Sequence, residues 1–168
     1  MTAAKRKIPD AVLRVQAEAA DPERSVFVSA NAGSGKTHVL VQRVINLLLR
    51  GCDPSKILCI TFTKAAAATM SNRVFDTLAN WATLNDAALD DAIEQSQGTK
   101  PDAKQRALAR RLFAAALETP GGLKVQTIHA FCTRVLQQFP FEADVAAHFS
   151  VLEERTQKEM LELSLIHI

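Results

Sequence analysis

A glycine-containing loop lies between a run of β-prone residues and a helical pattern near the start of the chain, and it leaves few folds open. Residues 25–29 read Ser-Val-Phe-Val-Ser, residues 30–37 read Ala-Asn-Ala-Gly-Ser-Gly-Lys-Thr, and apolar residues then recur at helical spacing as far as Gly51. A tight loop between a strand and a helix turns backbone N–H groups toward an anion. The arrangement predicts a nucleotide-binding α/β domain in which residues 25–29 form a buried parallel strand and Gly51 caps the helix.

The residue types in this loop suit a nucleoside triphosphate. Gly33 and Gly35 let the backbone come close to phosphates, Lys36 can reach the β and γ phosphates, and the Thr37 hydroxyl can join the shell of a magnesium ion. A chance glycine turn is the alternative, but it explains neither the strand before the loop nor the helix after it. We therefore predict ATP and Mg²⁺ as ligands and Lys36 and Thr37 as catalytic residues. The predicted nucleotide-binding loop is Ala30, Asn31, Ala32, Gly33, Ser34, Gly35, Lys36, Thr37 and His38.

Strand and helix patterns alternate along most of the remaining chain. The patterns predict strands at residues 57–62 and 123–128, and helices at residues 11–20, 64–81, 102–117 and 129–138. Such alternation is typical of a parallel sheet with helices on both faces. The polar stretch at residues 83–101 predicts a flexible or variable insertion, and residues 149–163 predict an extended element followed by a charged helix. We expect one domain over residues 1–142, the start of a helical subdomain over 143–163, and a tail over 164–168 that is a candidate non-native ending.

Composition indicates a globular domain but does not identify a partner. Hydrophobic residues make up 48% and charged residues 23% of the sequence, and the net charge is +2, from 20 basic and 18 acidic residues. This balance does not by itself indicate nucleic-acid binding. Cys52, Cys59 and Cys132 lack the spacing of a zinc or redox motif and are expected to be buried, reduced thiols. No secretory signal or membrane-spanning run is recognisable, so a cytoplasmic location is expected.

Hydroxyl and aromatic residues follow two of the predicted strands. Ligands of open α/β sheets gather at the carboxyl ends of strands. Phe62 follows one strand and offers a flat face to a base, although composition alone favours a buried phenylalanine. Thr127 and His129 follow another strand and can hydrogen-bond a sugar–phosphate backbone, although a lone histidine is more often structural. Side by side, the two strand ends would form one edge for binding a polynucleotide.

These stretches, in this order, resemble superfamily-one helicases of the UvrD and RecB kind, and within them the AddA subunits of bacterial AddAB helicase-nucleases. Residues 30–37 resemble the family's Ala-x-Ala-Gly-Ser-Gly-Lys-Thr loop, which accounts for alanine at the first position. Residues 61–70, with Arg73, resemble the first DNA-contacting motif. Residues 127–132, continuing to 139–143, resemble the next motif. The asparagine that is common in UvrD relatives after the second threonine is absent here. The resemblance extends over residues 12–154.

The resemblance implies a RecA-like P-loop fold, and a parent protein that moves along single-stranded DNA and unwinds duplex DNA ends in double-strand break repair and recombination. It implies that Gln16 reads the adenine ring. It also implies a distant nuclease domain and an AddB-like partner. The DNA contacts implied are Thr61, Phe62, Thr63, Lys64, Thr127 and His129.

Hydrolysis in such motors needs an Asp-Glu pair on a buried strand and arginines from a second RecA-like domain. The sequence shows neither, so we expect this chain to bind ATP, to hydrolyse little of it, and to unwind no DNA. Two charged groups are expected to be solvated helix faces: the acidic pair Asp90 and Asp91, and the basic cluster of Lys104, Arg106, Arg110 and Arg111. A P-loop nucleotide or small-molecule kinase and a non-catalytic ATP-binding adaptor are the alternative functions.

Overall fold

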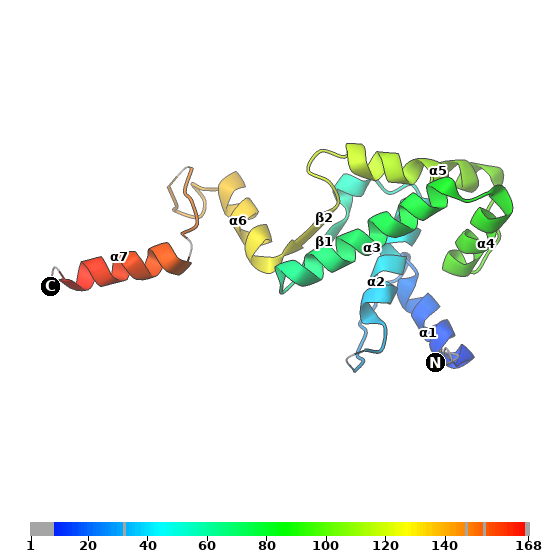
Figure 1. The fold of residues 1–168 in the computed structure, drawn as a ribbon, viewed down its shortest axis with the longest axis horizontal. Helices are drawn as coiled ribbons and strands as arrows, with labels where there is room; N and C mark the ends of the chain where they lie inside the picture. Colours follow the sequence, from blue (N-terminus) through cyan, green and yellow to red (C-terminus); the bar gives the residue numbers. More distant parts are fainter. Residues whose placement is uncertain (1–8, 32, 147, 153, 167–168) are drawn as a thin grey trace, which may run out of the picture. The chain divides into compact units, whose positions relative to one another are not determined.

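The computed structural model describes residues 9–31, 33–146, 148–152 and 154–166 (Figure 1). The chain divides into two compact units, residues 1–126 and residues 127–168. In chain order the elements are α1 (Asp10–Ala20), α2 (Lys36–Leu49), the short 3₁₀ helix η1 (Pro54–Lys56), β1 (Leu58–Thr61), α3 (Lys64–Thr83), α4 (Asp86–Gln97), α5 (Ala103–Glu118), β2 (Lys124–Thr127), α6 (Ile128–Gln138) and α7 (Glu154–Ile166). The domain boundaries expected at residues 142 and 163 stay a prediction.

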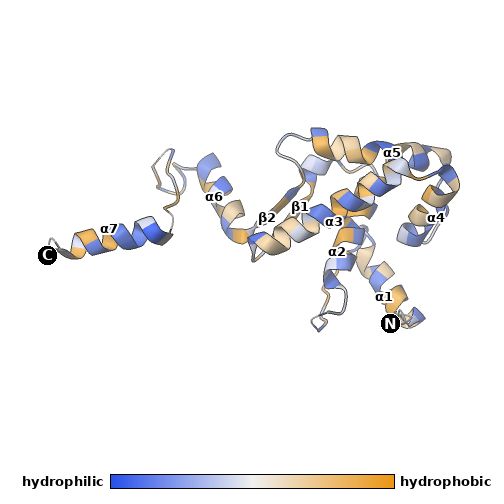
Figure 2. Cartoon of the chain, viewed as in Figure 1, coloured by the Kyte–Doolittle hydropathy of each residue, from blue (hydrophilic) through white to orange (hydrophobic). Residues whose placement is uncertain are grey.

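Helices α2, α3, α4 and α5 enclose the core of the first unit. Each helix buries residues that recur at helical spacing, so each turns one apolar stripe inward. On α3 the stripe is Met70, Val74, Leu78 and Trp81, and all four side chains are buried. Figure 2 shows that hydrophobic and hydrophilic residues alternate along this helix. Small residues on the buried face of α5, such as Ala109 and Ala116, allow it to pack closely on α3.

Side chains cap most of the helix amino termini. Thr63 accepts a hydrogen bond from the Ala66 N–H at 3.1 Å at the start of α3, and Asn85 accepts one from the Ala88 N–H at 2.9 Å at the start of α4. Asp102 and Gln105 form a capping box on α5. Such caps satisfy N–H groups that have no partner within the helix.

The carboxyl end of α2 confirms the cap predicted at Gly51. Gly51 has a φ of +79°, its N–H donates to the Leu48 carbonyl at 2.9 Å, and the Cys52 N–H donates to the Leu47 carbonyl at 3.1 Å. These two bonds form a Schellman motif, in which glycine takes the left-handed conformation without steric cost.

The sheet is smaller and less covered than predicted. It contains β1 and β2, which pair in parallel, so the predictions of strands near residues 57–62 and 123–128 are confirmed. Cys59 on β1 is buried, but Leu58 and Ile60 on its other face are each 43% exposed. Helices therefore cover β1 on one face and not on both within the described part of the chain.

The prediction of a buried strand at residues 25–29 was wrong for this structure. The segment has no regular secondary structure, and Phe27 at its centre is 93% exposed. A buried parallel strand needs hydrogen-bonded neighbours and covered faces. Neither β1 nor β2 pairs with this segment, so its β-prone composition alone does not make it a strand.

Two further expectations are corrected by the helices. The polar stretch at residues 83–101 is largely helical, because α4 spans Asp86–Gln97 and buries Leu89 and Ile93 completely. The helical pattern predicted to end at Leu163 continues, because α7 reaches Ile166. Residues 167 and 168 of the predicted tail lie outside the described residues, and its origin is untested.

The second unit contains α6 and α7. No residue of α6 is buried, and apolar side chains such as Val135 on α6 and Leu161 on α7 are exposed. The other predicted helices, at residues 11–20, 64–81, 102–117 and 129–138, are confirmed as α1, α3, α5 and α6. Among the described residues, no helix has the length and apolarity required to cross a bilayer.

Candidate phosphate-binding site

The loop before α2 has the backbone conformation that its glycines predict. Gly33 has a φ of +79° and Gly35 a φ of +90°, a left-handed region that other residues rarely enter. Gly35 is also the residue from which α2 begins. A Cβ atom added to it would lie 3.1 Å from Nε2 of Gln16, so a side chain here would crowd the neighbouring helix. Ala32, another predicted loop residue, lies outside the described residues.

The amino terminus of α2 differs from those of α3, α4, α5 and α6. Those helices have side-chain caps, whereas α2 starts at Gly35 with no side-chain cap. The first N–H groups of a helix have no intrahelical partner and carry partial positive charge. Thr37 and His38, whose N–H groups belong to this first turn, are both exposed. This end of α2 can therefore accept an anion.

The Lys36 side chain folds back onto the loop that precedes it. Its ammonium group donates hydrogen bonds to the carbonyl oxygens of Ala30 at 2.5 Å and Asn31 at 2.7 Å. The Ser34 hydroxyl also donates to Asn31, at 2.7 Å. An ammonium group carries three protons, so one remains for a further acceptor. Lys36 thus adds positive charge at the same end of α2.

Gln16 from α1 lies against this loop. Its Nε2 donates to the Ser34 carbonyl at 3.4 Å, and its side chain is half-buried. The side-chain amide has a donor and an acceptor, and its oxygen has no hydrogen bond among the described residues. The helix that carries Gln16 therefore forms a wall of the site.

A hollow of about 690 Å³ opens between α1, residues 24–30 and the loop. Gln16, Ser34 and Lys36 line its polar end, and Val12, Val15 and Phe27 line the rest. Pockets for small ligands usually have volumes of about 300–1,000 Å³, with mainly apolar walls and a few polar groups. The hollow therefore has the size and chemistry for a ligand with an apolar part and a phosphate part. The described residues contain no cluster of three or more His, Cys, Asp or Glu side chains that could hold a metal ion.

The segment after β1 exposes the aromatic ring that the sequence singled out. Phe62 is 85% exposed, so the burial that composition favoured is wrong. The Thr63 hydroxyl caps α3, and the Thr61 hydroxyl accepts a hydrogen bond from the Thr63 N–H at 3.3 Å. Thr63 and Lys64 are exposed as well. This strand end therefore offers a free aromatic face next to a positive charge.

The corresponding residues after β2 belong to the second unit. Thr127 is buried, and its hydroxyl caps α6 by accepting from the Ala130 N–H at 3.2 Å. His129 lies in the first turn of α6 and is exposed. Both strands thus pass into a helix through a capping threonine, as the two sequence stretches predicted. In Thr127 the hydroxyl oxygen is committed to the cap, which leaves His129 as the more accessible of the two.

The charged groups on α4 and α5 are paired with each other. Arg106 donates two hydrogen bonds to the Asp90 carboxylate, at 2.7 and 2.5 Å, and Arg110 donates to Asp86 at 2.5 Å. The Arg106 guanidinium lowers the pKa of Asp90 below its ordinary value. Neither charged group is simply a solvated face, because these pairs hold α4 against α5.

The cysteines also differ from expectation. Cys59 is buried, and burial raises the pKa of its thiol. Cys52 is half-buried and Cys132 is exposed, so the prediction of buried thiols holds only for Cys59.

Comparison with known proteins gives one consistent result. Residues 14–166 match the family of UvrD/REP helicase N-terminal domains. The chain is 38% identical over 136 residues to a Latilactobacillus sakei protein, 37% over 137 residues to a Levilactobacillus brevis protein, and 33% over 147 residues to a Lactobacillus johnsonii protein. All three carry the name of the AddA component of an ATP-dependent helicase/nuclease. The matches cover 81%, 82% and 88% of this chain but only 13%, 9% and 10% of the respective relatives. The chain therefore spans about a tenth of the length of these curated relatives.

Proposed function

The chain belongs to the UvrD/REP helicase N-terminal domain family, and from this membership we propose that it is the ATP-binding part of an ATP-dependent DNA helicase. The observation that carries the proposal is the start of α2, where a left-handed Gly35 leaves the first helical turn without a side-chain cap beside the Lys36 ammonium. An anion at this position would meet both free N–H groups and a positive charge.

Each residue of the site has a defined role in the proposal. The N–H groups of the loop and of the first turn of α2 hold the β and γ phosphates, and Lys36 donates its remaining proton to a phosphate oxygen. The exposed Thr37 hydroxyl is the protein ligand to magnesium, which commonly binds proteins through few side chains and the phosphates of its substrate. Gln16 holds the adenine ring through its side-chain amide. The binding set is Gln16, Ala30, Asn31, Ala32, Gly33, Ser34, Gly35, Lys36, Thr37 and His38.

The DNA-binding part of the proposal rests on the residues after the two strands. The exposed Phe62 ring stacks on a base of single-stranded DNA, while Thr61, Thr63 and Lys64 contact the neighbouring phosphates. Thr127 and His129 make the equivalent contacts after β2. In the longer parent, binding at these residues is coupled to ATP hydrolysis in a RecA-like motor. That parent acts on duplex ends in double-strand break repair, together with a nuclease domain and an AddB-like partner.

The test measures two affinities of the native chain, one for Mg-ATP and one for an oligothymidylate. Calorimetry gives the first, and fluorescence anisotropy of a labelled oligonucleotide gives the second. We expect both ligands to bind, with little ATP hydrolysis in either the presence or the absence of DNA. A chain that binds no Mg-ATP contradicts the proposal. A chain that binds Mg-ATP, ignores DNA and phosphorylates a nucleoside monophosphate is a kinase instead.

A further inference from the structure

Arg43, in the middle of α2, holds the end of α1 through the backbone. Its guanidinium donates hydrogen bonds to the carbonyl oxygens of Ala19 at 3.2 Å, Asp21 at 2.5 Å and Arg24 at 2.5 Å. The last carbonyl groups of a helix have no intrahelical partner and carry partial negative charge. A half-buried arginine therefore caps the carboxyl end of α1 and the turn that follows it.

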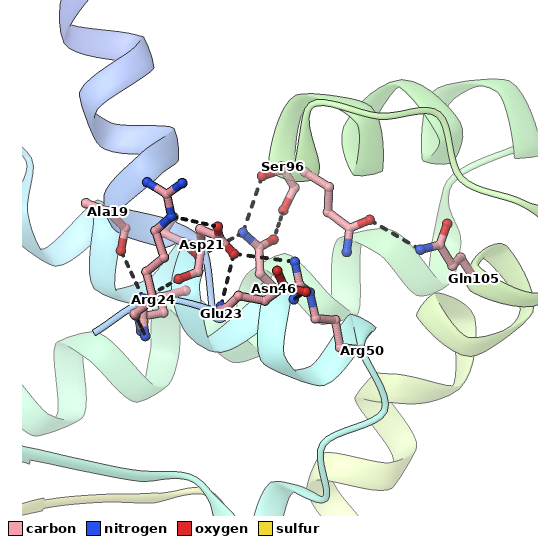
Figure 3. A network of polar contacts seen from close by, with 11 residues as sticks. Ala19, Asp21, Glu23, Arg24, Asn46, Arg50, Ser96 and Gln105 are labelled. Atoms are coloured by element: carbon pink, nitrogen blue, oxygen red, sulfur yellow. Dashed lines mark hydrogen bonds and ion pairs between the residues drawn. The ribbon is translucent and has the colours of Figure 1, made fainter. Parts of the chain in front are cut away.

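Asn46, one turn further along α2, continues the same contact. It is only 5% exposed, and its Nδ2 donates to the Ala20 carbonyl at 3.2 Å, while its Oδ1 accepts from the Ser96 hydroxyl at 2.7 Å. Figure 3 shows Asn46 within this polar network, with Ser96 reaching it from the end of α4. The amide thus joins the ends of α1 and α4 to α2.

An apolar contact supports the polar one. Ala19 and Ala20 at the end of α1 are buried together with Val39, which lies one turn before Arg43 on α2. Gln16 precedes Ala19 by three residues and Ala20 by four, so all three lie on the same face of α1. The contact that fixes the end of α1 therefore also fixes the direction in which Gln16 faces.

We infer that Arg43 is a positioning residue for recognition of the nucleotide base, acting through α1 to hold Gln16 beside Ser34 and Gly35. The inference rests on the proposed function, because it concerns how the same site selects its ligand. Arg43 is remote from the loop in sequence and touches the backbone alone, so its effect on the ligand passes through the placement of α1. Adenine presents a donor and an acceptor on one edge, whereas guanine presents two acceptors there. A correctly held amide of Gln16 distinguishes these two patterns.

The experiment compares the affinities of the full chain for Mg-ATP and Mg-GTP. The variants are Arg43→Ala, Arg43→Lys, Gln16→Ala and the double variant Gln16→Ala/Arg43→Ala. We expect Arg43→Ala to lower the preference for ATP by roughly 5- to 30-fold, as expected for one or two lost hydrogen bonds. Gln16→Ala should lower it by a similar factor, and the double variant should lower it no further, because both changes remove the same contact. Arg43→Lys keeps the charge but loses the fork of donors, so its preference should be intermediate.

The matched control is Arg106→Ala, which removes an arginine that binds α4 instead of α1. Its ATP-to-GTP ratio should equal that of the native chain even if its stability falls. A native chain without a preference for ATP, or an unchanged preference in Arg43→Lys and in whichever Arg43 variant folds by circular dichroism, overturns the inference. If Lys36→Ala abolishes Mg-ATP binding while the Arg43 variants keep the native ratio, the proposed function stands and only the role of Arg43 fails. If the native chain binds no nucleotide, both fail.

Discussion

The Lys36 ammonium group donates to the Ala30 carbonyl at 2.5 Å, so the side chain closes the loop from which it emerges. The same group is expected to meet the phosphates of ATP. Replacing Lys36 by alanine removes a charge-assisted hydrogen bond, which contributes about 1.5–3 kcal/mol. We therefore expect Lys36→Ala to weaken Mg-ATP binding by roughly 10- to 100-fold in a calorimetric titration.

Lys104→Ala is the matched control for this experiment. Lys104 is exposed on α5 and is absent from the proposed site, so its removal lowers the net charge of the chain by the same amount. Its affinity for Mg-ATP should be unchanged. Equal affinities of the native chain and Lys36→Ala would remove the loop from the proposed site.

Phe62→Ala tests the strand end after β1. The ring is 85% exposed, so its loss should leave the stability of the fold unchanged. Stacking on a base contributes about 1–3 kcal/mol, and we therefore expect binding of an oligothymidylate to weaken by roughly 5- to 150-fold in an anisotropy titration. Phe141→Ala, at a phenylalanine that is 84% exposed and lies outside the proposed DNA contacts, is the control. Equal losses in the two variants would mean that any exposed ring suffices.

Local signals predicted the helices and the loop, while longer-range relationships escaped prediction. The glycines, the cap at Gly51 and the apolar stripe of α3 depend on residues a few positions apart. The predicted strand at residues 25–29 depends instead on hydrogen-bonded partners elsewhere in the chain, which local propensity does not supply. For the site, the loop and Gln16 were identified in advance and lie together, as the contact between Gln16 and Ser34 confirms. Arg43 was missed because its partners are backbone carbonyls, which leave no mark in the sequence.

Helix α4 was missed although its signals are present. Asn85 and Gly98 cap its two ends, and Leu89 and Ile93 lie four residues apart on one face. Only two large apolar side chains mark this face, and the surrounding polar residues hid them. The Asn46 amide gives another missed signal, because a polar residue within the buried stripe of α2 implies partners in the core.

Ile93→Ala tests whether α4 is part of the core. The side chain is fully buried, and truncating such a residue to alanine typically costs about 2–5 kcal/mol. We expect a loss of this size in the free energy of unfolding, measured by urea denaturation. Leu117→Ala, at a residue of α5 that is 59% exposed, should cost far less. A loss for Ile93→Ala as small as that for Leu117→Ala would mean that residues 86–97 are an independent insertion.

Arg106→Ala should reveal the ion pair with Asp90 through the dependence of stability on pH. Hydrogen bonding to Arg106 lowers the pKa of Asp90 from its ordinary value of 3.8. A lowered pKa in the folded state adds stability above the ordinary value, and this contribution disappears as the pH falls through the folded-state pKa. Thermal melts should therefore show a lower midpoint for Arg106→Ala at pH 7, and the difference from the native chain should shrink steadily below pH 4. A difference that is constant from pH 7 to pH 3 would assign the effect to packing of the arginine stem.

Gly35→Ala and Gly98→Ala form a pair that separates backbone strain from loss of the site. Both glycines have positive φ, +90° and +75°, and an alanine in that conformation costs about 1–2 kcal/mol. We expect similar losses of folding stability from the two changes in urea denaturation. Only at Gly35 would the new Cβ crowd Gln16, at 3.1 Å, whereas nothing lies within 4 Å of a Cβ at Gly98. Gly35→Ala should therefore also weaken Mg-ATP binding, while Gly98→Ala should bind Mg-ATP as the native chain does. If both variants bind as well as the native chain, the phosphates do not approach the backbone at Gly35, and the anion must lie elsewhere along α2.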